Sequence, residues 1–206
     1  MKTEQLYDAN EEAWLTKLHF GCGDIYLRGY TNLDVYGELS DTLSEKALLE
    51  HSTTICEYYR KAGSWGSLPE RASVIVDERM RMQSVEYEYP HGSVDKIIAV
   101  QSMEYLDPID FITTLDGCLQ ALRKPGVLIV SVPDMDGTLD LLEDPEKVAF
   151  AARHLRGAER DKWSFRRSWW TYETLYKAFE WVGFNAVQSL PNFHVYPAIV
   201  MKGQKI

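Results

Sequence analysis

Short apolar runs alternate with longer amphipathic segments along the chain, and this alternation is typical of an α/β protein. The runs that predict β-strands cover residues 17–20, 31–35, 72–76, 94–100, 127–132, 185–189 and 198–202. Apolar positions at helical spacing predict helices over residues 3–15, 44–61, 108–123 and 171–182, with one or two more between 139 and 155.

The order of these elements predicts the architecture of the sheet. The strand at 94–100 is almost fully apolar, as expected for a central strand that is covered on both faces. The last two strands have no helix between them, which indicates an antiparallel hairpin at one edge. We therefore expect a doubly wound, mostly parallel seven-stranded α/β sheet with an antiparallel edge hairpin.

Helix-end signals bound two of the helices. Asp107 is the expected N-cap of the helix at 108–123, and Pro108 suits its first turn. Thr171 is the expected N-cap of the late helix, which Gly183 ends. The buried face of the earlier helix is expected to consist of Ile109, Ile112, Leu115, Leu119 and Leu122.

Two glycines, Gly21 and Gly23, follow the first strand, and Asp34 ends the second. Glycines let backbone approach a nucleotide-containing ligand, and an acid at the next strand end can accept hydrogen bonds from a ribose diol. A tight turn without a ligand is the alternative. The link from Gly23 to Asp34 is too short for a full helix, so we expect a stunted helix or a loop there. This short link disfavours a nicotinamide-dependent oxidoreductase.

Length and composition narrow the class of protein. With 206 residues, we expect one domain over 1–206, with residues 1–16 as an N-terminal helix or cover. A net charge of −9 argues against nucleic acid as a partner. No apolar run approaches the roughly 20 residues of a membrane span, and the N-terminus lacks a signal core. Three scattered cysteines without metal-ligand spacing fit a reducing cytoplasm and predict no metal site.

Several segments match one family in order and spacing. Residues 18–23 with 26–34 resemble LNLGCG…LPGfiNvD, residues 90–98 resemble PF-x-x-x-SVD-x-I, and residues 101–106 resemble xxxLEHL. Residues 122–128 resemble LKPGGxL, and 170–184 resemble a late helix that ends in GF. The chain thus resembles class I S-adenosylmethionine-dependent methyltransferases, specifically the small bacterial type 11-like subgroup, over most of residues 17–190.

The sequence departs from the family pattern at three positions. His19 stands where many members have an acid, Tyr105 replaces the histidine of LEHL, and Arg166 replaces a later histidine. His19 is either a helper residue or a strand residue with a local partner. The departures at Tyr105 and Arg166 motivate an alternative function, a non-catalytic S-adenosylmethionine-binding partner subunit with the same fold.

The resemblance implies a Rossmann-like methyltransferase fold and S-adenosylmethionine as cofactor. Asp34 would hold the ribose, Gln101 would line the methionine part, and Met82 with Gln83 would flank adenine, with Asp77 as the rival of Gln83. The cofactor-binding residues would be Phe20, Gly21, Cys22, Gly23, Asp34, Met82, Gln83 and Gln101.

The implied reaction is in-line methyl transfer to a small-molecule or saccharide-precursor acceptor, in which proximity supplies much of the rate. A base is needed only for a hydroxyl or a protonated amine. The candidates are Asp134 and Tyr105, because His194 is more typical of a solvated loop residue. Residues 138–170 would form a variable insertion on the substrate side. A homodimer is left open.

Residues 163–170 hold three tryptophans and two arginines. In one interpretation, Arg166 and Trp169 bind substrate, the tryptophan by stacking and the arginine by pairing with an anionic group. In the other, the indoles pack on the core.

Overall fold

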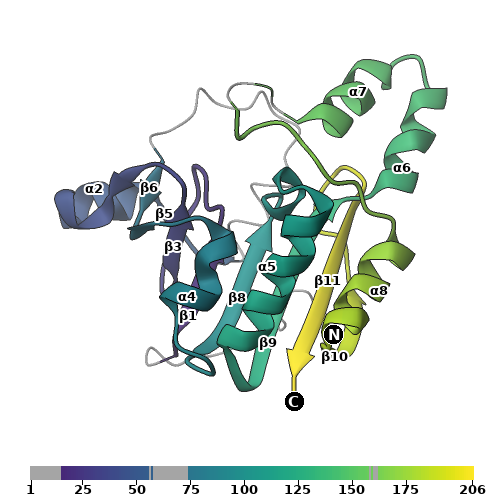
Figure 1. Cartoon of the computed structure of the whole chain (residues 1–206). Helices are drawn as coiled ribbons and strands as arrows, with labels where there is room; N and C mark the ends of the chain where they lie inside the picture. Colours follow the sequence, from purple (N-terminus) through teal and green to yellow (C-terminus); the bar gives the residue numbers. More distant parts are fainter. Residues whose placement is uncertain (1–14, 56, 58–73, 158, 160–161) are drawn as a thin grey trace.

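A twisted seven-stranded sheet forms the centre of the protein (Figure 1). The computed structural model describes residues 15–55, 57, 74–157, 159 and 162–206. The strand order is β10-β11-β9-β8-β1-β3-β7. Neighbouring strands are parallel except where β11 pairs with β10 and β9. The strands are β1 (Lys17–Phe20), β3 (Thr31–Asp34), β7 (Glu78–Arg79), β8 (Val94–Val100), β9 (Leu122–Pro133), β10 (Asn185–Leu190) and β11 (Ala198–Lys205). This arrangement confirms the expected fold class.

Two short parallel ladders lie beside the main sheet. β2 (Tyr26–Leu27) pairs with β5 (Ser52–Thr53), and β4 (Glu38–Leu39) pairs with β6 (Ile75–Val76). The expected strand at 72–76 is therefore wrong as a member of the main sheet, because its described part pairs with β4 and β7 forms the edge. The link after Gly23 is a turn followed by β2, so the loop alternative is confirmed.

Three helices, α4 (Val85–Glu88), α5 (Pro108–Ala121) and α8 (Tyr172–Val182), cover one face of the sheet (Figure 1). The Asp107 side chain accepts hydrogen bonds from two backbone N–H groups of α5, and Thr171 forms a capping box with Thr174, which confirms both N-caps. The expected face of α5 is wrong at Ile109, which is 77% exposed. The helix instead buries Phe111, Thr114, Leu115, Gly117, Cys118 and Ala121.

The central strands bury side chains on both faces. Leu18, Phe20 and Ile97 belong to the cluster beneath α5 and α8. Ile98 and Ile129 point to the opposite face, where residues that include Leu27, Tyr30 and Ile55 cover them. A strand covered on both sides needs apolar residues at successive positions, which explains the nearly unbroken apolar run of β8.

The early helical predictions are only partly described. α2 covers Glu45–His51 and ends at β5, so the predicted helix at 44–61 is shorter there than expected. The predicted helix at 3–15 lies almost entirely outside the described residues. No helix in the described part of the chain is long and apolar enough to span a membrane.

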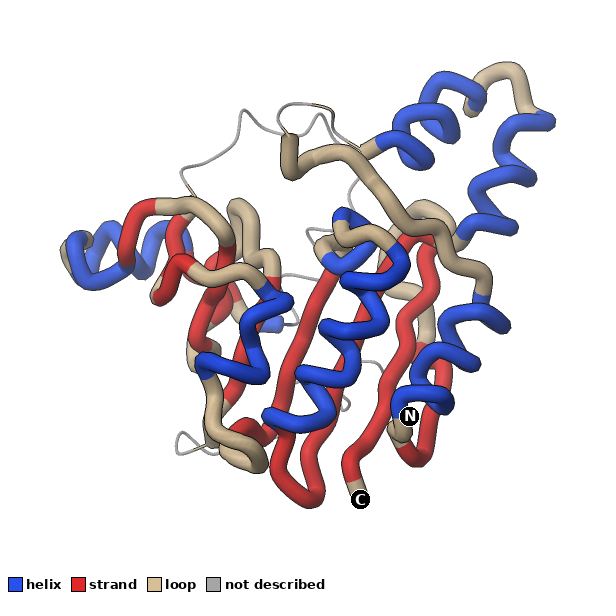
Figure 2. The backbone as a smooth tube through the Cα atoms, in the orientation of Figure 1, coloured by secondary structure: helices blue, strands red, loops and turns tan. Residues whose placement is uncertain are grey.

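A group of helices extends beyond the carboxyl end of β9 (Figure 2). It consists of α6 (Met135–Asp140), the 3₁₀ turn η4 (Leu141–Glu143) and α7 (Val148–Arg156). The chain then returns toward the sheet as residues 162–170, which we call the strap. The strap is tied to α7 by a bridge between Gly157 and Phe165 and by a hydrogen bond from Arg166 N to Arg156 O of 3.0 Å.

Candidate functional site

The turn after β1 contains two glycines, one packed against its surroundings and one that faces open space. Gly21 and Gly23 have φ angles of +58° and +55°, which non-glycine residues rarely adopt. A Cβ on Gly21 would clash with the Cβ of Ser102, so the segment that follows β8 packs directly against this turn. A Cβ on Gly23 would meet nothing within 4 Å. The turn is therefore packed on one side and open to a ligand at Gly23.

Asp34, at the end of the adjacent strand β3, is bonded to this turn. Gly23 N donates to Asp34 Oδ2 at 2.9 Å, and Val35 N donates to Oδ1 at 2.7 Å. These bonds fix the orientation of a half-buried carboxylate beside the open glycine. A carboxylate can accept about four hydrogen bonds, so its chemistry suits a vicinal diol in addition to the two backbone donors.

Asp77, the rival candidate for the adenine site, is committed to a structural network. Its carboxylate accepts hydrogen bonds from Tyr26 Oη at 2.6 Å, Ser40 Oγ at 2.6 Å and Asn32 N at 2.7 Å. Burial, together with the bond to Asp77, raises the pKa of Tyr26 to about 12. Asp77 therefore joins β2, β3 and the loop after β4.

The other two adenine candidates lie in the 3₁₀ turn η2 (Met82–Ser84). The methyl group of Met82 lies 3.4 Å from the position of a Cβ on Gly21, so this side chain reaches the glycine turn. Gln83 Nε2 donates to Asp110 Oδ2 of α5 at 3.1 Å. The structure thus brings Met82 to the turn and ties the amide nitrogen of Gln83 to a helix.

Phe20 and Cys22 contribute backbone rather than side chains to the turn. Phe20 is fully buried in the core. Cys22 Sγ donates to Ile75 O at 3.5 Å and packs with Val74 and Val76. Burial, followed by the nearby Asp34 carboxylate, raises the pKa of the Cys22 thiol well above its usual range. Neither side chain is directed to a ligand at Gly23.

His19 is a structural residue of β1. It is fully buried, and its Nδ1 lies 3.0 Å from Asn32 Oδ1. Burial lowers the pKa of its imidazole to about 4, so the ring is neutral at physiological pH. Of the two interpretations of this residue, the structure supports the strand residue with a local partner.

Gln101 sits at the carboxyl end of β8 in a strained conformation. Its φ is +51°, and its backbone N–H donates to Ser131 O of β9 at 2.8 Å. Its side-chain Oε1 accepts a hydrogen bond of 3.1 Å from Arg166 Nη2. A non-glycine residue in this region of φ costs of order 1–3 kcal/mol and is typical of functional sites.

Glu104 is the residue that sequence reasoning missed. It lies in the 3₁₀ turn η3 (Met103–Tyr105), is fully buried, and its Oε1 lies 3.4 Å from Arg166 Nε. Burial raises the pKa of its carboxyl to about 7, against the opposing attraction of Arg166. An acid between Met103 and Tyr105, shortly after a central strand, was the available signal.

The remaining candidates lie in η3, on the strap and at the N-cap of α6. Arg166 lies 6.0 Å from the ring centroid of Tyr105. Asp134 begins α6, and burial raises the pKa of its carboxyl. Trp169 is 51% exposed and donates its Nε1–H to Leu155 O at 3.0 Å, whereas Trp170 is buried against Phe111. The tryptophans of the strap therefore divide between surface and core.

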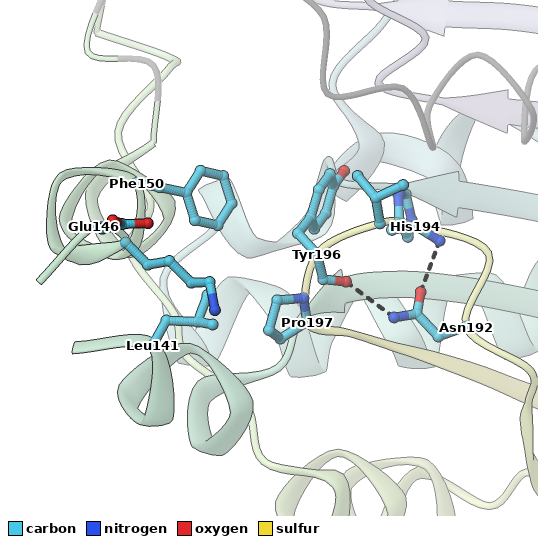
Figure 3. Close-up of a pocket in the computed structure, with 9 residues that line it drawn as sticks. Leu141, Glu146, Phe150, Asn192, His194, Tyr196 and Pro197 are labelled. Atoms are coloured by element: carbon cyan, nitrogen blue, oxygen red, sulfur yellow. Dashed lines mark hydrogen bonds between the residues drawn. The ribbon is translucent and has the colours of Figure 1, made fainter. Parts of the chain in front are cut away.

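A cavity of about 620 Å³ opens between α7 and the loop that joins β10 to β11 (Figure 3). Phe150 and Tyr196 face each other across it, above Pro197. The expectation of a solvated His194 is wrong. This side chain is 7% exposed, its Nε2 lies 2.9 Å from Ser131 Oγ of β9, and its ring stacks on Tyr196. The cavity lining comprises Leu141, Glu146, Lys147, Phe150, Asn192, His194, Val195, Tyr196 and Pro197.

Among the described residues, no group of three or more His, Cys, Asp and Glu side chains is placed to hold a metal ion. The polar groups at the carboxyl ends of the strands form two sets instead. Gly23, Asp34 and Met82 surround the turn after β1, and Gln101, Glu104 and Arg166 lie at the end of β8.

The fold is that of the class I S-adenosylmethionine-dependent methyltransferases. No protein-family model and no curated protein matches the chain. A SAM-dependent methyltransferase from Methanosarcina mazei is 14% identical with a TM-score of 0.57, and the match covers 100% of this chain and 98% of that one. A SAM-dependent methyltransferase from Archaeoglobus fulgidus is 13% identical with a TM-score of 0.52, over 94% and 87% of the two chains.

A third solved structure, "PigF with SAH", is 16% identical with a TM-score of 0.52, over 98% of this chain and 53% of that one. The chain thus spans about half the length of PigF, and the same holds for the methyltransferase SibL, of which it covers 52%. At these identities the likeness establishes the fold.

Proposed function

We propose that the chain binds S-adenosylmethionine at the carboxyl ends of β1, β3 and β8 and transfers its methyl group to a small-molecule or saccharide-precursor acceptor. The observation that carries the proposal is the bond from Gly23 N to the Asp34 carboxylate, beside a glycine whose Cβ position is open. In a sheet of this strand order, that edge is where ligands bind.

The residues at this edge suit the parts of the cofactor. Asp34 would accept hydrogen bonds from the two ribose hydroxyls. Met82 and Gln83 would flank adenine, and Gln101 would line the methionine part. The backbone from Phe20 to Gly23 would pass close to the ligand, because the side chains of Phe20 and Cys22 point into packed regions.

When bound, S-adenosylmethionine supplies a methyl group already activated by a sulfonium. The residues of this chain therefore have to align the acceptor with that methyl group, and alignment supplies much of the rate. Asp134 and Tyr105 are the candidates to take a proton from a hydroxyl or a protonated amine. Burial raises the pKa of Asp134, which makes its carboxylate a stronger base than an exposed one. Arg166 and Trp169 would contact the acceptor.

The cavity beside Tyr196 would hold the body of the acceptor. It is built by the helices that follow β9 and by the β10–β11 loop, within and next to the insertion at 138–170. The same edge of the sheet carries Gln101 and Arg166. This placement supports an acceptor side at β8 and β9, next to a cofactor side at β1 and β3.

Titration calorimetry with S-adenosylmethionine tests the proposal, and no heat at high micromolar concentration would count against it. Asp34→Ala should weaken binding at least about a hundredfold, since two charge-assisted bonds of about 1.5–3 kcal/mol each are lost. Asp34→Asn, which keeps one oxygen acceptor, is the matched variant and should lose less. Unchanged affinity in a folded Asp34→Ala protein refutes the ribose assignment. Binding without turnover on any acceptor would favour the non-catalytic alternative.

A further inference from the structure

Two buried hydrogen-bond donors belong to side chains that are bonded to each other at the end of β8. They are Nη1 of Arg166 and Nε2 of Gln101, and within the described part of the chain neither has an acceptor in reach. The two side chains are joined through the bond from Arg166 Nη2 to Gln101 Oε1. The Arg166 side chain is only 9% exposed, so solvent does not take the place of the missing acceptor.

Such an arrangement is costly without a partner. A buried donor that is left unpaired costs the desolvation of that group, and the cost is larger for a charged one. The guanidinium plane holds its N–H groups in a fixed fork, and a neighbouring amide N–H extends this donor set. A carboxylate has two oxygen acceptors and can pair with more than one such donor, so it is the chemical partner that suits this pair of side chains.

The position of Arg166 favours the acceptor rather than the cofactor. Arg166 belongs to the strap, and its backbone is bonded to α7 through Arg156 O. Its charge acts on Tyr196, a wall of the cavity, and on His154 of α7. The glycine turn and Asp34 lie on the other side of β8 in the strand order.

We propose that Arg166 and Gln101 bind the carboxylate of an aromatic acid, with its ring toward the cavity that Phe150 and Tyr196 line. This inference rests on the proposed function and gives the chemical class of the acceptor. A single negative charge suits the site better than a phosphate dianion, because the buried Glu104 carboxyl lies 3.4 Å from Nε of the same guanidinium. The aromatic cavity walls suit a flat ring.

The test uses benzoate and its neutral isostere benzamide, titrated into the protein saturated with S-adenosylhomocysteine. We expect benzoate to bind at least about tenfold more tightly than benzamide. Arg166→Met should lower benzoate affinity by about tenfold to a hundredfold and leave benzamide affinity unchanged, because only the charged ligand uses the fork. Arg167→Met, which removes the exposed neighbouring arginine, is the matched control and should bind benzoate normally.

A second variant distinguishes the loss of the guanidinium fork from misfolding of the protein. Arg166→Lys keeps a cation beside Glu104 but loses the fork, and it should still reduce benzoate affinity several-fold. Equal binding of benzoate and benzamide, or normal benzoate affinity in either variant, overturns the inference. The inference is also overturned if Arg166→Met loses affinity for S-adenosylhomocysteine but keeps its affinity for 5′-methylthioadenosine. That result would mean that Arg166 binds the carboxylate of the cofactor and not that of the acceptor. Failure of the wild type to bind S-adenosylhomocysteine defeats the proposed function itself.

Discussion

Replacing Glu104 with glutamine should change how the stability of the protein depends on pH. The carboxyl is fully buried, and Arg166 is the cation that faces it. Tyr196 also senses the charge of Glu104, and Tyr105 interacts with the Tyr196 hydroxyl, but tyrosines do not titrate near neutral pH. Glu104→Gln keeps the shape of the side chain and removes the titration.

The magnitude follows from the pKa of Glu104, which is 4.5 for an ordinary glutamate and about 7 in the folded protein. Between these values the folded state binds more protons than the unfolded state. Stability therefore falls as pH rises through this window, by about 3 kcal/mol in full. Between pH 5 and pH 8 the loss from this one group should be about 2–3 kcal/mol. The glutamine variant should lack it.

Urea unfolding followed by circular dichroism, at pH 5 and pH 8, gives the free energy of unfolding of both proteins. The quantity to compare is the change with pH in each protein, because loss of the buried carboxyl shifts the absolute stability of the variant. Burial lowers the pKa of both His19 and His154 to about 4, so these groups reduce stability as pH falls below about 6.5. They do so in both proteins and largely cancel in the comparison.

Parallel pH profiles for wild type and Glu104→Gln would refute the reasoning. They would mean that the carboxyl of Glu104 titrates in the folded protein as it does in the unfolded chain. The ion pair with Arg166 would then compensate fully for burial, and the guanidinium would hold a permanent counter-charge.

Two further predictions concern the glycine turn and its support. Gly21→Ala should destabilise the fold by more than about 2 kcal/mol, because its Cβ would clash with Ser102 in a backbone conformation that is already strained. Gly23→Ala has the same backbone strain but open space, so it should cost only about 1–2 kcal/mol in urea unfolding and should lose cofactor affinity in calorimetry. Asn32→Ala should cost about 3 kcal/mol in urea unfolding, since Asn32 is fully buried and its side chain bonds both Leu27 N and Leu27 O, and Leu27 N would lose its acceptor. A wild-type midpoint in either Gly21→Ala or Asn32→Ala would contradict these structural roles.

The elements that the sequence predicts best are those whose burial matches a simple pattern. The boundaries of β1 and β8 agree with the apolar runs at 17–20 and 94–100, because central parallel strands need apolar residues on both faces. Asp107 and Thr171 were predictable as N-caps because a short polar side chain before a periodic segment has a local function. These signals need no knowledge of tertiary contacts.

The edge of the sheet and the buried face of α5 could not be predicted in the same way. β7 is only Glu78–Arg79, and both residues are exposed, so the true edge strand has no apolar signal. The apolar run before it pairs with β4 instead. In α5, Thr114 is fully buried while Ile109 is exposed, because tertiary packing determines which face of a helix is covered.

The cofactor side and the acceptor side of the candidate site also differ in how well the sequence predicts them. Gly21, Gly23 and Asp34 are close in sequence, so a local pattern reveals them together. Arg166 meets Gln101 because contacts from distant parts of the sequence fix the strap, and Glu104 makes several of them. Its backbone carbonyl accepts from Arg167 N at 2.9 Å and Ser168 N at 3.2 Å.

Glu104, in the 3₁₀ turn η3 that follows β8, therefore contacts the strap backbone with its carbonyl and the Arg166 guanidinium with its side chain. A carboxylate that bound Arg166 would add a second negative charge to the guanidinium that Glu104 already faces. Two anions on one buried cation repel each other, so binding would favour the protonated form of Glu104. Benzoate binding should accordingly be accompanied by proton uptake near pH 7, and Glu104→Gln should bind benzoate without it.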